Sequence, residues 1–471
     1  MGGKMKKMRR LISIQITVVA VLSTLVLGRA SAVEPLGQSS LPPGGWVSGT
    51  QVQNVGTAPA TVMMIYHSED GSTTYNGAGI TVAPGASGTF YLEPGVPDGF
   101  LGSAVVYSSE PVSSVTNVDN LSTGARGSYN GFETGASQVN FPLVKREYWG
   151  ASTAIFIQNT DTDEVTVTPS YKRGAETWTG AAVAINAGFA KEFSAADDGV
   201  PTGFVGSAVF SATGDIAGTY VEYMGNTASV GTGFPTGVES TKVYVPLVKK
   251  FYWGAVTGIQ VQNVGSLPAP IFVTYKSVAG VEYVSTVGGG ADVEVGASRT
   301  YYLDPVLPGS AGSPDGFLGS AIITSAQPIV AIVNEAQLDG SIATTNAGIN
   351  DGLQTTKISV PLVKKFYWGS ASGIQVQNVS SAPAPISVTY KSVGGVEYVS
   401  NVGGGASLAP GASRTYYLDP VLPGSAGSPD GFLGAAIITS AQPIVAIVNE
   451  GPVDMYTTGD GMSTNAFNLA P

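Results

Sequence analysis

The chain of 471 residues contains no cysteine and a single histidine, His67. Without cysteine it has no thiol nucleophile, disulfide or zinc–thiolate site. One histidine argues against histidine-based catalytic triads and against metal sites built from several histidines. Most enzyme classes use cysteine or several histidines as nucleophiles, bases or metal ligands. Because this chain has almost none of these residues, we expect a protein that is not an enzyme and that needs no cofactor.

Charged residues are also scarce, at 12% of the chain, which is about half the share in an average protein. The surface must therefore consist largely of Ser, Thr, Asn, Gln and Gly, which is typical of extracellular proteins. The 63 glycines and 29 prolines are many, but hydrophobic residues make up 43% of the chain, enough for packed cores. The length predicts about three or four domains.

Residues 1–32 have the pattern of a secretory signal peptide. Basic residues between Lys4 and Arg10 precede an apolar run from Leu11 to Leu27, and the small residues Ala30-Ser31-Ala32 follow. The apolar run is near the length of a short membrane-spanning helix, so a retained signal anchor is the alternative. We favour cleavage after Ala32, because the small residues stand where a signal peptidase reads them.

Removal of this segment takes away six basic residues and no acidic ones, which changes the net charge from −11 to −17. A nucleic acid is therefore an unfavourable partner, since no basic patch is present to neutralise phosphates. No later stretch of the sequence is long and apolar enough to span a bilayer. We expect a secreted or cell-surface protein that makes no membrane contact once the signal is cleaved.

Internal repetition is the strongest signal in the sequence. The motif Gly-x-Gln-Val-Gln-Asn-Val at 258–264 recurs at 49–55 and 373–379, and a looser copy lies at 154–160. A second motif, Pro-Asp-Gly-Phe-Leu-Gly-Ser-Ala, ends at residues 104 and 321, with variants ending at 208 and 436. Both motifs recur every 104 to 115 residues, which is too long for a solenoid unit and matches a β-sandwich domain of about 100 residues.

Each unit consists of short runs of alternating apolar and polar residues between turn residues, and no helical periodicity follows residue 32. Ile259 and Val261 alternate with Gln260 and Gln262, which predicts a strand with one buried and one water-facing side. The predicted fold is all-β, with four tandem immunoglobulin-like antiparallel β-sandwich domains after an N-terminal signal helix. In the third unit the expected strands lie near residues 243–248, 258–263, 271–276, 281–287, 299–303, 319–324 and 329–334.

A Val-Pro-Leu-Val-Lys-Lys stretch at 245–250 and 360–365, with a variant at 141–146, runs directly into Tyr-Trp-Gly. It could open or close a unit, and the first unit retains little of it beyond Trp46. We interpret it as a closing strand, which gives β-sandwich units at 33–146, 147–250, 251–365 and 366–471. Because almost no linker then separates the units, the array is predicted to be a stiff rod.

These motifs resemble repeat modules of exported surface proteins from filamentous, often thermophilic, bacteria of the Chloroflexi type. In those modules a Pro-Leu-Val-x-Lys strand, an aromatic-Gly step, a Gln-Val-Gln-Asn strand and a Pro-Asp-Gly-Phe-x-Gly-Ser-Ala segment recur in the same order, and the likeness covers essentially the whole chain after residue 32. The resemblance implies a secreted or cell-surface array of β-sandwiches, with no catalytic residues to carry over. The second unit departs from the pattern at Thr202 and at 194–196, so any site built on acids there is absent from it.

Recurrent acids beside the Pro-Asp-Gly turns are the candidate metal ligands. Such oxygens bind Ca²⁺ when several carboxylates stand close together, and each cluster here offers about two. Turn chemistry, in which Asp caps the turn and Gly takes a positive φ, is the interpretation we favour, with Ca²⁺ as the alternative. The acids are Asp98, Asp315 and Asp430, with Glu93, Asp304 and Asp419 nearby.

The aromatic steps contain Trp149, Trp253 and Trp368. These residues could stack on sugar rings as ligand contacts, but packing in a core or between domains is the more common role of an aromatic beside glycine, and we favour it. The lysine pairs at 249–250 and 364–365 fall in expected strands. Such pairs typically protect a strand edge against edge-to-edge aggregation, and an autocatalytic isopeptide bond that uses Lys, Asn and Glu is the alternative. No pair of carboxylates stands out as a glycosidase site.

We therefore expect a non-enzymatic structural or adhesive protein of the cell surface or extracellular sheath. Its repeats would multiply weak contacts with surface or matrix polymers. Two alternatives stay open: a carbohydrate-binding surface protein, and an extracellular filament subunit whose terminal strand pairs with a neighbouring chain. Glycans and a second copy of the chain are accordingly the expected partners.

Overall fold

The computed structural model describes residues 39–469 except 92, 253, 279, 287–291, 303–314, 338–342, 402–406, 418–429 and 453–461. In these residues every regular element is a β-strand, and the strands pair antiparallel. The predicted antiparallel all-β fold is confirmed, whereas the expected signal helix at 1–32 lies outside the described residues. A helix able to cross a bilayer is absent from the described ranges.

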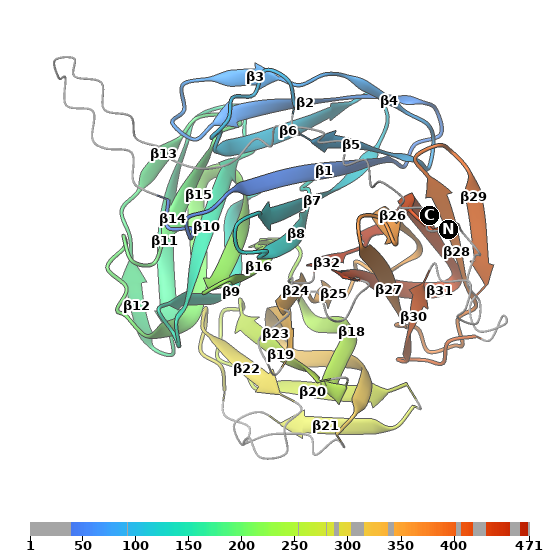
Figure 1. Ribbon diagram of the computed structural model, residues 1–471. Coiled ribbons are helices and arrows are strands. Elements are labelled where there is room, and N and C mark those ends of the chain that lie inside the picture. Colours follow the sequence, from blue (N-terminus) through green and yellow to red (C-terminus); the bar gives the residue numbers. More distant parts are fainter. Residues whose placement is uncertain are drawn as a thin grey trace, which may run out of the picture.

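The four repeats lie around a common centre, coloured from blue through green and yellow to red in Figure 1. One short strand of each repeat lies at the centre, where β16 (Thr227–Thr232) contacts β8 and β24 (Ala343–Ala347), and β32 (Met462–Asn465) contacts β24 and β8. The predicted stiff rod is therefore wrong, because the chain closes into a ring. Repeat 1 runs from β1 (Trp46–Asn54) to β8 (Arg126–Asn130), repeat 2 from β9 (Ala136–Arg146) to β17 (Phe234–Pro235), repeat 3 from β18 (Ser240–Tyr252) to β25 (Ile349–Asn350), and repeat 4 from β26 (Thr355–Lys365) to β33 (Phe467–Asn468).

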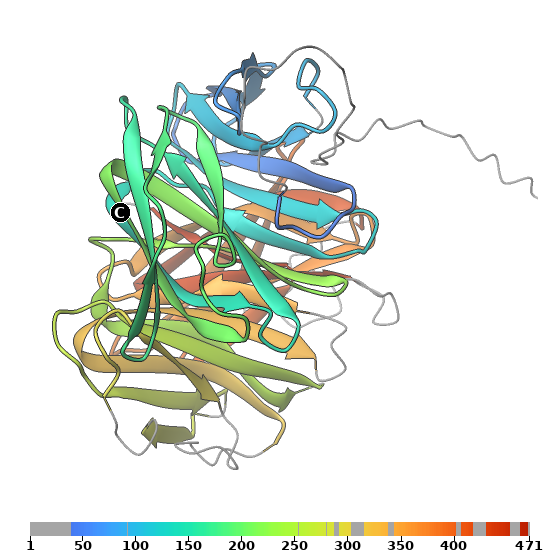
Figure 2. The ribbon, with the colours of Figure 1, turned by 90° about the vertical axis from the view of Figure 1, so that its left-hand side faces the viewer.

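Repeat 1 contains two separate four-stranded sheets, whereas the strands of repeats 2, 3 and 4 form one connected sheet each. Figure 2 shows the ring from the side of repeat 2, in green. In repeat 1 the first sheet has the order β5-β1-β7-β8, with β5 (Ser87–Tyr91) and β7 (Val112–Asn120). In the second sheet β2 (Ala60–Ser68) pairs with β3 (Thr74–Asn76), β4 (Ile80–Val82) and β6 (Gly102–Ser108). In repeats 2 to 4 one strand of 21 residues takes the places of β6 and β7 and so connects the strands of the repeat into one sheet: β15 (Phe204–Met224), β23 (Phe317–Gln337) and β31 (Phe432–Pro452).

The remaining strands of repeats 2 to 4 repeat this plan. Repeat 2 adds β10 (Ala151–Asn159), β11 (Val165–Arg173), β12 (Glu176–Thr179), β13 (Val183–Ile185) and β14 (Ala190–Ser194). Repeat 3 adds β19 (Ala255–Asn263), β20 (Ile271–Ser277), β21 (Glu282–Thr286) and β22 (Ser298–Tyr302). Repeat 4 adds β27 (Ser370–Asn378), β28 (Ile386–Ser392), β29 (Glu397–Asn401) and β30 (Ser413–Tyr417).

The Pro-Leu-Val-Lys strand is paired in the repeat that follows it. β9 pairs with β15, β18 with β23 and β26 with β31. The interpretation of this strand as the closing strand of a unit is therefore wrong, because the short Tyr-Trp-Gly turn ties it as a hairpin to the next strand along the chain. Each such strand also contacts the next repeat around the ring: β9 contacts β19 and β23, β18 contacts β27 and β31, and β26 contacts β1 and β7. One strand thus serves two neighbouring repeats.

The Gln-Asn motif is buried at the junctions between repeats. Gln260 and Gln262 are 4% and 0% exposed, so the face that was expected to meet water is covered by the neighbouring repeat. The carbonyl of Gly296, in a turn with φ of 75°, accepts hydrogen bonds from Gln262 Nε2 (3.0 Å) and from Ser207 Oγ of repeat 2 (2.6 Å). The carbonyls of Gly188 and Gly411 are held in the same way by Ser103 and Ser320 of the preceding repeat.

Apolar contacts join neighbouring repeats along the chain, and a polar contact closes the ring. Val330 of repeat 3 belongs to the core cluster of repeat 2, and Val445 of repeat 4 packs with Tyr244 of repeat 3. Where repeat 4 meets repeat 1, Ser359 and Ser113 bring their hydroxyl oxygens to 2.8 Å. The seam between the first and last repeats is therefore more polar than these two junctions.

A closed ring of repeats predicts a compact molecule in solution. A compact chain of this length has a radius of gyration of about 23 Å. Small-angle X-ray scattering of the protein without residues 1–32 should give a value close to this. A clearly larger radius, with a maximum dimension of several repeat lengths, would contradict the ring.

Asn263 provides a test of the buried motif. Its Nδ2 donates to the carbonyls of Leu267 and Val293 (2.8 Å each), and its Oδ1 accepts from the Gly265 N–H (3.0 Å). Asn263→Ala should lower the free energy of unfolding by about 2–3 kcal/mol, because buried backbone groups lose their partners. The exposed Asn226→Ala is the control and should change it by no more than about 0.5 kcal/mol in denaturant titrations. Equal effects of the two substitutions would contradict this role.

Candidate functional site

The aromatic steps form the tips of tight hairpins. Tyr148-Trp149-Gly150 connects β9 to β10, and the backbones of Tyr148 and Ala151 exchange hydrogen bonds of 2.9 and 3.0 Å. Trp149 and Gly150 have φ values of 53° and 83°, the left-handed pair that a two-residue turn of this type requires. Tyr367-Trp368-Gly369, between β26 and β27, repeats this geometry with Trp368 at a φ of 49° and hydrogen bonds of 3.1 Å.

The two tryptophans project into solvent. Trp149 is 86% exposed and Trp368 is 80% exposed. Each indole stacks on the preceding tyrosine, with ring centres 5.4 Å apart and planes within 16° of each other. The prediction that these aromatics pack in a core or between repeats is wrong for both, and Trp253 lies outside the described residues. A left-handed non-glycine residue costs about 1–3 kcal/mol, and an indole this exposed gains little from packing, so the strain marks a candidate binding site.

A tyrosine of the next repeat lies within electrostatic range of the Trp149 turn. Tyr302 of repeat 3 is partly exposed, and Tyr148 and Glu222 of repeat 2 act on it electrostatically. Burial raises the pKa of Tyr302, and the charges of Tyr148 and Glu222 raise it further. The hydroxyl is therefore protonated at neutral pH and can donate a hydrogen bond. Burial also raises the pKa of Tyr417 of repeat 4, with added contributions from Tyr252 and Glu335 of repeat 3.

The first lysine of each lysine pair is bound to a glutamate on the long strand. Lys249 Nζ lies 2.5 Å from Glu335 Oε1, and both side chains are less than a fifth exposed. These lysines are therefore paired and largely buried, contrary to the expectation that they guard an exposed strand edge. The same contact joins Lys145 to Glu222 and Lys364 to Glu450 at 2.6 Å.

The second lysine of each pair meets one of the recurrent aspartates. Lys250 Nζ lies 3.3 Å from Asp315 Oδ1, and the lysine side chain is 4% exposed while the aspartate is 74% exposed. Lys365 and Asp430 have the same geometry. These two carboxylates therefore neutralise nearly buried ammonium groups, a role that sequence reasoning missed because it treated the two motifs separately.

Asp98, the equivalent aspartate of repeat 1, is exposed and forms no ion pair with any described residue. Glu93 accepts a hydrogen bond from the Ala78 N–H (2.8 Å), while Asp304 and Asp419 lie outside the described residues. In the described part of the chain, no group of three or more His, Cys, Asp or Glu side chains gathers as a metal site would require. Asp98 is thus the one aspartate of the three that is left without a lysine among the described residues.

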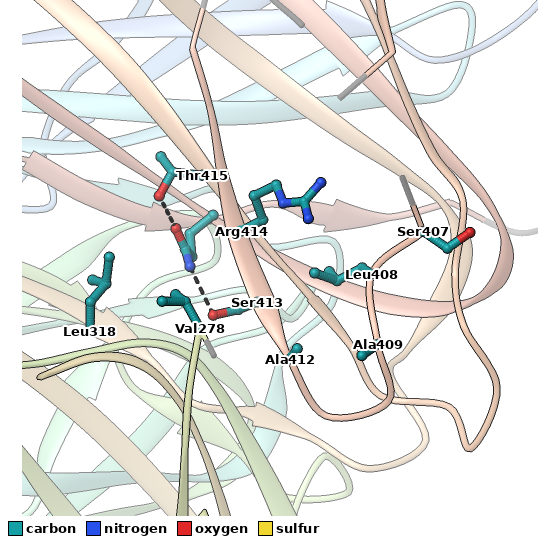
Figure 3. A pocket seen from close by; sticks show the side chains of 10 residues that line it. Val278, Leu318, Ser407, Leu408, Ala409, Ala412, Ser413, Arg414 and Thr415 are labelled. Atoms are coloured by element: carbon teal, nitrogen blue, oxygen red, sulfur yellow. Dashed lines mark hydrogen bonds between the residues drawn. The ribbon is translucent and has the colours of Figure 1, made fainter. Parts of the chain in front are cut away.

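A cavity of about 290 Å³ lies where repeat 3 meets repeat 4 (Figure 3). Val278 and Leu318 line one side, and Gln375, Ser413 and Thr415 line the other. Gln375 donates to Ser413 Oγ (2.9 Å) and accepts from Thr415 Oγ1, so these polar groups bind one another rather than point freely into the cavity. The cavity is therefore a weaker candidate site than the turns.

A second cavity, of about 90 Å³, lies on the ring axis. Its walls are hydroxyl and amide side chains from all four repeats, together with backbone. Asn346 Nδ2 donates to Ser463 Oγ (3.2 Å) and Asn130 Nδ2 to the carbonyl of Asn465 (2.7 Å), so the lining ties the repeats together. At this size it holds about three waters at most.

The chain matches no protein-family model, and a comparison with curated proteins gives no match either.

The exposure of the turn tryptophans can be tested against a buried tryptophan. Trp46, in repeat 1, is 3% exposed, donates from Nε1 to the carbonyl of Pro42 (2.9 Å) and packs with Val221 and Val230 of repeat 2. Trp46→Ala should cost about 3–5 kcal/mol of unfolding free energy. Trp368→Ala should cost no more than about 0.5 kcal/mol. Thermal unfolding of the two variants measures these changes in stability. A large loss of unfolding free energy for Trp368→Ala would show that its indole packs against the protein.

Proposed function

We propose that this chain is a non-enzymatic adhesive protein of the cell surface or extracellular sheath, which binds neutral glycan polymers through its tyrosine–tryptophan turns. The observation that carries the proposal is the exposure of Trp149 and Trp368, held out by left-handed turns and stacked on tyrosines. A protein gains nothing in stability from such an arrangement. A ligand that covers the indole gains the burial of a large, rigid aromatic surface.

A sugar ring fits the chemistry beside the turn. Its apolar C–H face can lie on the indole, while its hydroxyl groups need hydrogen-bond partners at the edge. The hydroxyl of Tyr302, which is within electrostatic range of Tyr148 and is protonated at neutral pH, can donate one such hydrogen bond. Aromatic surface with a few polar groups at its rim is the usual composition of a small-ligand site.

The charge of the protein favours a neutral polymer. The chain carries a net charge of −11, or −17 without residues 1–32. A polysaccharide rich in uronate or sulfate would be repelled by the field of such a protein, whereas a neutral glucan, mannan or chitin-like polymer would not.

Repetition around the ring adds avidity. Two exposed turns, at Trp149 and Trp368, are available to one polymer or to neighbouring polymers, and Trp253 stands at the same position of the sequence motif. Weak sites joined on one body bind more tightly together than singly. The proposal takes residues 1–32 as a cleaved secretory signal and each repeat as an immunoglobulin-like sandwich, both from the sequence.

Co-sedimentation with insoluble neutral polysaccharides, followed by a glycan array, tests the proposal. The double variant Trp149→Ala with Trp368→Ala should reduce retention at least ten-fold, because both described platforms are lost. Trp149→Tyr with Trp368→Tyr should retain part of the binding, since an aromatic face remains. The control is Tyr107→Ala, which removes an aromatic that is 51% exposed on β6, away from the turns.

The double alanine variant must keep the thermal unfolding temperature of the parent for the result to count. Equal retention of parent and double variant, or binding to lipid vesicles in place of every glycan tested, would contradict the proposal.

A further inference from the structure

Among the described residues, repeat 1 lacks a strand that the other three repeats have. In repeat 3 the first half of β23 is paired on both sides, with β20 and with β18, and β15 and β31 are flanked in the same way. In the described part of the chain β6, the equivalent strand of repeat 1, pairs with β2 alone. One edge of β6 therefore carries backbone N–H and C=O groups without strand partners, as on an open sheet edge.

The side chains of β6 are also less buried than the equivalent side chains of the other repeats. Ala104 and Val106 are half-buried, whereas Ala321 and Ile323, at the same positions of repeat 3, are fully buried. Gly102 is exposed, although its counterparts in the other repeats are buried. The core of repeat 1 thus has an apolar strip open to solvent on the side where β9, β18 and β26 lie in the other repeats.

An unpaired carboxylate lies at the end of the same strip. Where the strand is present, Lys250 of β18 reaches Asp315, and Lys365 of β26 reaches Asp430. Asp98 occupies the same place in the Pro-Asp-Gly-Phe motif of repeat 1, just before β6. It is the position to which the last lysine of such a strand would extend.

We propose that the free edge of β6, together with Asp98, is a strand slot that receives an extended segment of a partner polypeptide. β9, β18 and β26 define the chemistry of the occupant: apolar residues at alternate positions, a Pro-Leu-Val core and a basic pair at the end. In β18 the inward residues Val245 and Val248 are fully buried. A partner strand of this pattern would bury the β6 side chains, complete the sheet and place a lysine beside Asp98. Main-chain hydrogen bonds would give the affinity and the alternating side chains the specificity.

The described chain itself does not fill the slot. β9, β18 and β26 are each paired within their own repeats. Ser40, one of the few described residues before β1, lies against repeat 2, where its N–H and hydroxyl donate to Glu192 Oε1 at 2.7 and 2.5 Å. Because no segment among the described residues fills the slot, we assign it to a segment of another polypeptide, and this inference is independent of glycan binding.

A peptide with the sequence of residues 242–250, Lys-Val-Tyr-Val-Pro-Leu-Val-Lys-Lys, is the probe. Fluorescence anisotropy with the protein spanning residues 33–471 should give saturable binding of one peptide per chain. Hydrogen exchange should show new protection of the β6 amides. A peptide with Ser in place of Val245 and Val248 should not bind, because it cannot fill the core.

Asp98→Asn should weaken peptide binding about two- to five-fold, as expected for a largely exposed ion pair, and the effect should vanish in high salt. Asp163→Asn, at another exposed aspartate, is the control and should leave the affinity unchanged. A second variant replaces residues 33–45 with residues 242–254, which carry the strand and its turn. This graft should fill the slot from within the chain, raise the unfolding temperature and abolish peptide binding.

Three results would overturn the proposal. The peptide could fail to bind both the protein spanning 33–471 and a protein spanning 39–471. It could bind the shorter protein alone, which would assign the slot to residues 33–38 of the same chain. The β6 amides could instead become protected with rising protein concentration and no peptide, which would assign the edge to a second copy of the chain.

Discussion

The ring depends on strands that are shared between repeats. β9, β18 and β26 complete the sheets of their own repeats and at the same time cover the next repeat. A repeat on its own would therefore expose the face that its neighbour normally covers, including fully buried amides such as Gln262. This sharing explains why Val330 of repeat 3 belongs to the core of repeat 2. It also explains why the absence of one such strand leaves repeat 1 incompletely covered.

The sequence was enough to predict the period, the all-β class and most strands of repeat 3, because local alternation and turn residues determine these. It was misleading about Gln260 and Gln262. Alternation shows that two faces of a strand differ in polarity, but it does not show that the polar face meets water. Gln262 and Ser207 of the preceding repeat both donate to the carbonyl of Gly296, so the neighbouring repeat covers this side chain. The partners of that contact are far apart in the chain, so no local pattern contains it.

The candidate site was predictable in its residues and not in its geometry. The tryptophans stood out in the sequence, but the general preference of aromatics for packing gave the wrong environment for Trp149 and Trp368. The deciding feature is the left-handed backbone of each tryptophan, and Trp-Gly is not a pair that favours such a turn as Asn-Gly does. Similarly, the lysine pairs and the Pro-Asp-Gly turns were both recognised. Their contact follows from the register of β18 and β23, which places Lys250 opposite Phe317.

The polar seam has a mechanical consequence. Ser113 and Ser359 meet through hydroxyl groups, which water can replace at little cost in free energy. The first and last repeats lie on either side of this seam. Tension applied between the two chain ends therefore acts on the seam before any sheet is stretched. If a molecule is held at one end and attached to a polymer at the other, the ring would then open at this seam under flow, and the molecule would become longer. Repeats 2 to 4 would stay joined by their shared strands while this happens.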